Sequence, residues 1–345
     1  MRGALIAAER PAIVLGARAG GRADLAARLP ATVARLAEAL RAPVFTSPAA
    51  KGLAHVGQPW FAGTFLNGNP EASVLERCDV VLAVGLDAVD FFNVDWRYPA
   101  TILAVEPDPT NTQRFVPASM QVVCNLADLG EPSGRSAWQI SDVAAYRAEL
   151  ARLLPQDDEQ LTIPTALGEA RAVLPTETLL TVDAGFGKPL TAYLWPAREP
   201  NSCFTSHGLS TMGYAIPAAN ALKLVHPERP VLAVLGDGSL LMRACEIGVA
   251  AELGLAPIYV VWIDASLSQI EIKQRRQGLR PVGTRFPRPR CARIADAFGG
   301  VGWDVETRAD FRAALREALN QAVPSLIGAR VDQSSHDAWF DLIRG

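Results

Sequence analysis

The stretch Arg229–Gly248, RPVLAVLGDGSLLMRACEIG, contains the element that decides the fold. Its apolar run from Val231 to Leu235 is typical of a buried strand, and a helical pattern follows from Ser239. Between them stands Gly-Asp-Gly at 236–238, a carboxylate flanked by two residues without side chains. In open α/β sheets, ligands bind beyond the carboxyl ends of the strands, which is where Asp237 lies. The stretch therefore predicts an α/β sheet with a ligand site at Asp237.

Length and composition set the broad class. The chain has 345 residues, 49% of them hydrophobic and 20% charged, which indicates about two globular domains. The net charge of −3 argues against nucleic acid or an anionic membrane as partner. Five cysteines and four histidines form no CxxC pair or cluster, so we expect reduced thiols and no zinc site. With no apolar run long enough to span a membrane, we expect a soluble, cytoplasmic protein.

Short apolar runs alternate with helical segments along the whole chain, in two series. This alternation predicts two doubly wound parallel sheets, a Rossmann-like domain at 1–155 and a second domain at 156–345. The boundary is placed near Pro155 because the composition turns polar between residues 126 and 158. The expected strands lie in PAIVLG, APVFTS, CDVVLAVG, TILAVE, TLLTVD, RPVLAVLG, PIYVVWID and PSLIGARVD. The run SLLMRACEIGVAAELG is expected to form one helix.

A second carboxylate follows the next apolar strand. Asp264 ends PIYVVWID, 27 positions after Asp237, a separation that accommodates one helix and one strand. Adjacent parallel strands would bring both carboxylates to one edge of the sheet. A helix N-terminus favours anions, whereas two carboxylates favour a hard cation, so the pattern suits a Mg²⁺–phosphate ester. The alternative for Asp237 is an ordinary helix cap in a tight turn.

The Gly-Asp-Gly segment resembles the diphosphate-binding motif of thiamine-diphosphate enzymes. The resemblance implies that Asp237, Asp264 and the carbonyl of Ser266 coordinate Mg²⁺. It also implies cofactor contacts at Gly236 and through the backbone N–H groups of Gly238 and Ser239. The motif departs from the family pattern, because the second ligand is usually Asn and here is Asp264, which adds one negative charge.

Ser206–Leu224, SHGLSTMGYAIPAANALKL, resembles the cofactor-holding segment of acetolactate-synthase-like enzymes. By this resemblance Met212 holds the cofactor in its bent conformation and the Ser210 carbonyl accepts from the aminopyrimidine; a core methionine is the alternative. VDAGFG, at 182–187, resembles a loop with further contacts at Gly185, although it has Phe-Gly where relatives are polar. His207, five residues before Met212, is a candidate pocket residue. No catalytic residue can be assigned in this chain.

The first half is similar to the central domain of the same superfamily, so that the resemblance covers about residues 8 to 335. LGARAGGRAD is not a GxGxxG fingerprint, and we do not expect FAD or an adenosine nucleotide in this domain. The pyrimidine-binding domain of the family, which supplies the catalytic glutamate, has no counterpart in the sequence. We therefore expect a separate subunit to supply it, in a hetero-oligomer.

The implied activity is that of a two-component decarboxylase or carboligase acting on a 2-oxo acid or a 2-hydroxy ketone, with thiamine diphosphate and Mg²⁺. In the helix expected after Asp264, Leu267 and Ile270 are candidates for substrate contact or core packing, and Lys273–Arg276 for a solvated or partner-facing run.

Three alternatives stay open. A non-catalytic homologue would keep the fold as a binding or regulatory subunit. A magnesium-dependent phosphatase also uses Gly-Asp-Gly, but its nucleophile motif would need Asp where this chain has Glu106. A nicotinamide dehydrogenase would need the missing glycine fingerprint.

Overall fold

The computed structural model describes residues 1–21, 23–91, 95–109, 116–155 and 159–344. The chain divides into two compact units, each taken by itself below. The first comprises Met1–Leu153, Pro196–Ser202 and Asp341–Gly345, and the second comprises Leu154–Trp195 and Cys203–Phe340. Residues 156–158, at the expected boundary, lie outside the described part. Unlike the expected division at 155, the segments 196–202 and 341–345 group with the first unit.

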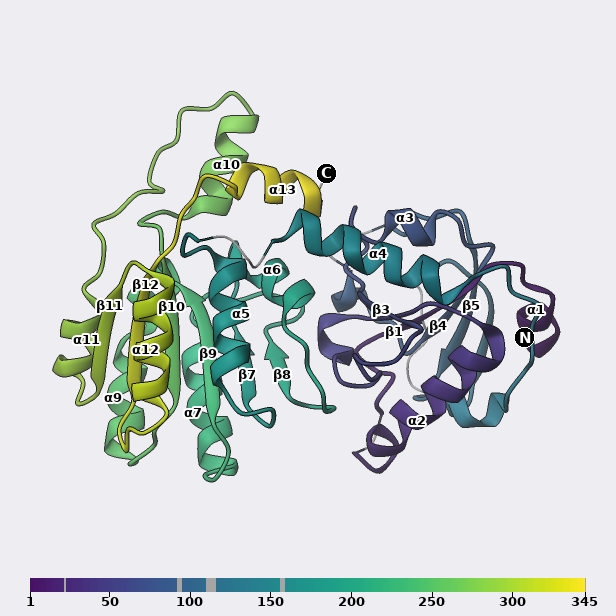
Figure 1. Cartoon of the computed structure of the whole chain (residues 1–345), viewed down its shortest axis with the longest axis horizontal. Coiled ribbons are helices and arrows are strands. Elements are labelled where there is room, and N and C mark those ends of the chain that lie inside the picture. Colours follow the sequence, from purple (N-terminus) through teal and green to yellow (C-terminus); the bar gives the residue numbers. More distant parts are fainter. Residues whose placement is uncertain (22, 92–94, 110–115, 156–158, 345) are drawn as a thin grey trace. The chain divides into compact units, whose positions relative to one another are not determined.

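The first unit contains a parallel sheet in the order β3-β2-β1-β4-β5-β6 (Figure 1). Its strands are β1 (Pro11–Leu15), β2 (Val44–Thr46), β3 (Phe61–Thr64), β4 (Val80–Val84), β5 (Thr101–Glu106) and β6 (Ala118–Val123). Its helices are α1 (Arg2–Ala7), α2 (Ala23–Leu40), α3 (Ala72–Leu75) and α4 (Ile140–Leu153), with short 3-10 turns at Pro48–Ala50, Ala88–Asp90 and Leu126–Leu129.

The core of this unit forms because its central strands are apolar along their whole length. Every residue of β1 and β4 is buried, as expected for parallel strands covered on both faces. Helix α2 adds an apolar stripe from Val33 to Leu40 and continues through Pro30, where the sequence predicted an interruption or kink. Helix α4 adds Tyr146, whose ring meets Phe45 of β2 edge-on at 5.7 Å.

The second unit has a parallel sheet in the order β11-β12-β10-β9-β7-β8. Its strands are β7 (Leu179–Val182), β8 (Cys203–Thr205), β9 (Val231–Gly236), β10 (Ile258–Ile263), β11 (Val301–Val305) and β12 (Ser325–Arg330). Its helices are α5 (Ile163–Val173), α6 (Gly187–Leu194), α7 (Ala215–Val225), α8 (Asp237–Arg243), α9 (Cys245–Glu252), α10 (Ser268–Arg276), α11 (Cys291–Ala297), α12 (Arg308–Ala318) and the start of α13 (His336–Arg344).

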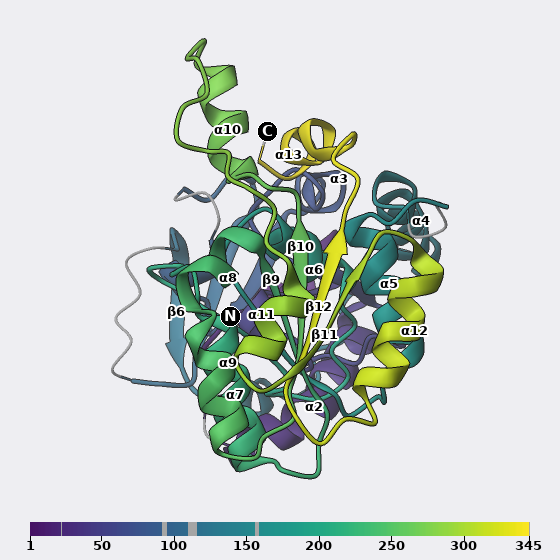
Figure 2. The ribbon, with the colours of Figure 1, turned by 90° about the vertical axis from the view of Figure 1, so that its left-hand side faces the viewer.

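Helices cover both faces of this sheet. Figure 2 shows α5 and α12 together on one face and α7 with α9 on the other, while α10 lies beyond the carboxyl ends of the strands. The chain runs from β7 outward to β8 and then returns to β9 on the other side of β7. The order of the strands therefore reverses between β7 and β9, and such a switch point is where open α/β sheets bind ligands.

The predicted fold class, two doubly wound parallel sheets, is confirmed. The prediction of one helix over residues 239–254 is wrong, because the segment divides at Ala244 into α8 and α9. Four strands were not predicted: β3, β6, β8 and β11. All four lie at sheet edges, where one side of the strand has no neighbour and the sequence need not be a continuous apolar run. No helix in the described ranges is long and apolar enough to cross a membrane.

Candidate functional site

Asp237 links the ends of two adjacent strands. It is the first residue of α8, directly after β9, and only 1% of it is exposed. Its Oδ1 accepts a hydrogen bond from the Gly238 N–H (2.9 Å), and its Oδ2 accepts from the N–H groups of Ala265 (2.7 Å) and Asp264 (3.2 Å), just after β10. Because β9 and β10 pair in parallel, their carboxyl ends meet here, as the sequence predicted.

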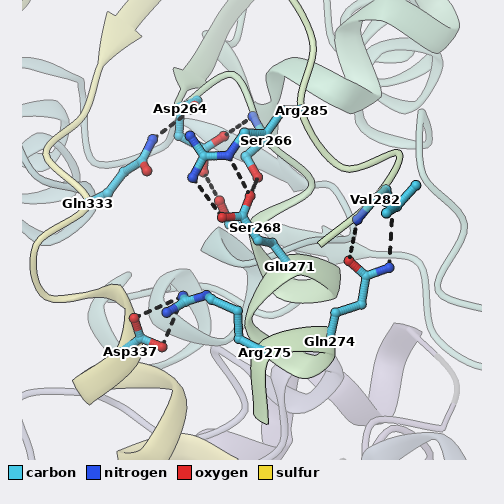
Figure 3. Close-up of polar contacts among 10 residues, drawn as sticks. All are labelled: Asp264, Ser266, Ser268, Glu271, Gln274, Arg275, Val282, Arg285, Gln333 and Asp337. Atoms are coloured by element: carbon cyan, nitrogen blue, oxygen red, sulfur yellow. Dashed lines mark hydrogen bonds and ion pairs between the residues drawn. The ribbon is translucent and has the colours of Figure 1, made fainter. Parts of the chain in front are cut away.

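Asp264 sits in a turn of its own. Its Oδ1 accepts from the Ser266 N–H at 3.1 Å, and its Oδ2 accepts from the Ser268 hydroxyl (Figure 3). Gln333 donates its Nε2 to the Asp264 carbonyl at 2.6 Å, so the segment after β12 supports this loop. Burial raises the pKa of Asp264, and it raises the pKa of Asp237 to about 7 with a further contribution from the Asp264 charge. The charge of Asp264 thus disfavours the ionisation of Asp237.

The donor set fits Mg²⁺. The described ranges contain no group of three or more His, Cys, Asp or Glu side chains placed to hold a metal. Mg²⁺, however, needs only one or two carboxylates when substrate phosphates and water fill its other positions. Two neighbouring carboxylates, one buried and one partly buried, are the arrangement that a divalent cation stabilises. The Ser266 hydroxyl donates to Glu271 at 2.8 Å, so the predicted role of Ser266 rests on its carbonyl.

Asp183, which the sequence reasoning did not single out, joins three segments at the switch point. It follows β7 and is 2% exposed. Its Oδ1 accepts from the Gly213 N–H (3.0 Å) and the Ser239 hydroxyl (2.7 Å), and its Oδ2 accepts from the Ala215 N–H (2.8 Å). Burial raises its pKa. The sequence did contain a signal, because Asp183 ends an apolar strand just as Asp237 and Asp264 do.

Met212 lies against the start of α8. A Cβ placed on Gly238 would be 3.3 Å from Met212 Cε and 2.8 Å from Leu267 Cδ2, so a side chain at position 238 would displace both. Position 238 must therefore stay small, and Met212 and Leu267 border the backbone at which the diphosphate is predicted to bind. Ser239 is 1% exposed, with its hydroxyl committed to Asp183, which leaves the predicted role to its backbone.

The loop around Ser210 is held by a lysine. Ser210 has a positive φ of 51°, rare for a residue other than glycine, and its hydroxyl accepts from Lys188 Nζ at 2.9 Å. The same Nζ donates to the Ser206 carbonyl at 2.7 Å. Lys188 belongs to no motif that the sequence revealed. His207 is half-buried in this loop, and its place in a pocket stays a prediction.

Gly185, Gly236 and Ile270, which were also singled out from the sequence, have different surroundings. A Cβ on Gly185 or Gly236 would meet open space, and Gly185 has a φ of 125° that requires glycine. Phe186, which stands where relatives have polar side chains, stacks on His336, with ring centroids 4.2 Å apart. Ile270 is exposed at 45%.

The run Lys273–Arg276 is not simply solvated. Arg275 and Arg276 both bind Asp337, through its carboxylate and its carbonyl respectively, and Arg276 also lies over the Phe340 ring. Half of the run therefore holds the segment that follows β12.

Two family profiles match the chain. Residues 2–130 match the profile described as "Thiamine pyrophosphate enzyme, central domain", and residues 183–329 match "Thiamine pyrophosphate enzyme, C-terminal TPP binding domain". Both domains belong to the thiamine pyrophosphate enzyme family. Thiamine pyrophosphate is thiamine diphosphate under another name, so the cofactor implied by the sequence resemblance is the cofactor of the family.

Individual relatives agree with this assignment. The chain is 30% identical over 340 residues to a probable 2-ketoarginine decarboxylase of Pseudomonas aeruginosa, and 28% identical over 342 residues to the large subunit of acetolactate synthase isozyme 1 of Escherichia coli. Each alignment covers 94% of this chain and 59% of the relative. A catabolic acetolactate synthase of Raoultella terrigena is 27% identical, over 79% of this chain and 51% of its own length. The chain thus spans somewhat more than half the length of these relatives.

Proposed function

We propose that the chain binds thiamine diphosphate together with Mg²⁺ at the carboxyl ends of β7, β9 and β10. The observation that carries the proposal is the bond network of Asp237, which ties the start of α8 to the turn at Asp264 beside the switch point. In this proposal Asp237, Asp264 and the Ser266 carbonyl hold Mg²⁺. The N–H groups of Gly238 and Ser239 hold the diphosphate.

The rings of the cofactor are proposed to lie against Met212, with the Ser210 carbonyl accepting from the aminopyrimidine. The position of Met212 supports this placement, because its Cε would lie 3.3 Å from a Cβ on Gly238 and so puts an apolar side chain near the backbone that is proposed to bind the diphosphate. Lys188 and Asp183 keep the two loops in position through their bonds to Ser210 and Gly213. These residues orient the cofactor and do not themselves react.

When bound, thiamine diphosphate supplies an electron sink for making or breaking a C–C bond next to a carbonyl. We propose that the substrate is a 2-oxo acid or a 2-hydroxy ketone and that the reaction is decarboxylation or carboligation. The support is that the similar proteins include a probable 2-ketoarginine decarboxylase and acetolactate synthases. The family match argues against the phosphatase and dehydrogenase alternatives.

We further propose that a pyrimidine-binding domain on a second polypeptide completes the site. Large apolar side chains are exposed near the proposed cofactor position: Leu209 is 93% exposed, Leu241 51% and Met242 57%. Leu209 adjoins Ser210, and the other two lie on α8. Exposed apolar side chains next to an incomplete binding site are typical of a surface that a partner covers.

The test is calorimetric titration of thiamine diphosphate with Mg²⁺ into the chain, alone and with a candidate pyrimidine-domain protein. We expect tight binding with the partner and its loss in Asp237→Ala. The matched control is Asp296→Ala, which removes an exposed carboxylate from α11. Tight binding without any partner would contradict the two-component proposal. No binding in either case would favour the non-catalytic homologue.

A further inference from the structure

A cavity of about 270 Å³ lies in the second unit beside α10. Its walls come from the turn after β10, one side of α10, the following loop and the segment after β12 (Figure 3). The lining residues are Ser266, Ser268, Glu271, Ile272, Arg275, Arg285, Gln333, His336 and Asp337.

This cavity is separate from the contact between Met212 and Gly238. Helix α10 gives the cavity the residues at 268, 271, 272 and 275, the spacing of a single helix face. Leu267, which borders Gly238, is not among the lining residues. The cavity therefore does not include the surroundings of Gly238, although it adjoins the proposed Mg²⁺ site through Ser266 and through Ser268, which donates to Asp264.

The lining carries two charges of each sign. Arg275 binds both oxygens of Asp337, at 3.0 and 3.2 Å. Arg285 binds both oxygens of Glu271, at 2.7 and 3.1 Å. The arginine side chains are 47% and 74% exposed, so they can shift toward a ligand at little cost. A lone anion would meet two carboxylates here and a lone cation would meet two guanidinium groups.

His336 forms part of the cavity wall. The residue is 4% exposed, and its Nε2 has no hydrogen-bond partner within the described part of the chain. Its ring is fixed by stacking on Phe186. Burial lowers the pKa of His336 to about 4, so the ring is neutral at pH 7. His336 therefore adds no charge to the cavity lining, whose charges come from the two ion pairs.

We propose that this cavity binds a small zwitterion of the α-amino acid class. The ligand carboxylate pairs with the guanidinium groups of Arg275 and Arg285, and its ammonium group pairs with Glu271 and Asp337. The volume is just below the roughly 300 to 1,000 Å³ of pockets for drug-sized molecules, so it suits a ligand of amino-acid size.

Calorimetric titration of the whole chain with free amino acids at neutral pH tests the proposal, without cofactor or partner. The probes are glycine, alanine, glutamine and arginine, with acetate and methylammonium as single-charge controls. We expect saturable binding of at least one amino acid at millimolar concentration and none of either control. Absence of amino-acid binding, or equally tight binding of acetate, would overturn the proposal.

Two variants locate the binding. Arg275→Gln and Arg285→Gln each remove an exposed guanidinium that lines the cavity and leave the core intact. Each is expected to weaken binding by about tenfold or more, as for the loss of a charged or buried hydrogen bond. The matched control is Lys273→Gln, because Lys273 is exposed on the same helix and does not line the cavity. Unchanged affinity in both variants would show that the amino acid binds elsewhere.

Discussion

Replacement of Asp183 gives the sharpest test of how the segment at Gly213–Ala215 is held against the start of α8. The carboxylate accepts three hydrogen bonds, from two backbone N–H groups and the Ser239 hydroxyl, and is almost completely buried. In Asp183→Ala the hydroxyl can rotate to another partner, but the buried N–H groups of Gly213 and Ala215 cannot. Each unsatisfied group costs about 1–3 kcal/mol.

The expected loss of stability follows from this count. Two orphaned N–H groups cost about 2–6 kcal/mol, and removal of a carboxylate whose burial is itself unfavourable offsets part of this. We therefore expect Asp183→Ala to lower the free energy of unfolding of the second unit by about 3 kcal/mol. Asp183→Asn keeps one acceptor and should lose about half as much, about 1.5 kcal/mol.

The assay is hydrogen exchange at the amides of Gly213 and Ala215, combined with urea unfolding. Exchange is the more direct measurement, because a chain of two units need not unfold in one transition. The matched control is Asp304→Ala, since Asp304 accepts a single N–H bond, from Cys291 at 2.8 Å, in the same unit. It should cost about 1 kcal/mol and leave the exchange of Gly213 unchanged.

The same variant should weaken cofactor binding, because Asp183 holds the Met212 loop against α8. We expect at least a tenfold loss of affinity for thiamine diphosphate with Mg²⁺. A different result would contradict this role of Asp183: that Asp183→Ala destabilises the unit less than Asp304→Ala does, and that the amides of Gly213 and Ala215 stay as protected from exchange as in the unaltered chain.

Three further predictions concern single sites in the second unit. Gly238→Ala should leave the fold intact, because its Cβ meets the flexible end of the Leu267 side chain, yet it should weaken cofactor binding about tenfold in calorimetry. The control Gly248→Ala, in α9, should leave the affinity for the cofactor unchanged. The pKa of His336 is lowered to about 4 from 6.5, so the unfolded chain takes up the proton first. This residue should therefore lower the free energy of unfolding by about 3 kcal/mol as the pH drops from 6.5 to about 4, and urea unfolding should show that His336→Phe removes this part of the pH dependence. Arg312 and Arg308 lower the pKa of Glu169, so its contribution to the free energy of unfolding is present above its unfolded-state pKa and is lost as the pH falls through its folded-state pKa. Glu169→Gln should therefore lower the free energy of unfolding by about 2 kcal/mol at neutral pH and by much less in acid, and an equal loss at both pH values would contradict this.

The central strands could be predicted from the sequence, and the edge strands could not. Strands such as β4, β9 and β10 are buried on both faces, so their sequences are continuous apolar runs that stand out from their neighbours. β6 is largely exposed, and β11 is only partly buried, so neither has such a run. Their pairing depends on backbone hydrogen bonds to a neighbour, which side-chain pattern does not record.

The sequence by itself determined that Asp237 and Asp264 end apolar strands, because burial dictates which residues a central strand can contain. Only the tertiary structure decided that β7 lies beside β9, so that Asp183 reaches Ser239 across 56 positions of the chain. It also decided that the segment after β12 folds back over α10 and buries His336 beside two ion pairs. Both arrangements depend on the order of strands in the sheet, which arises from contacts between distant segments and leaves no periodic pattern in the sequence.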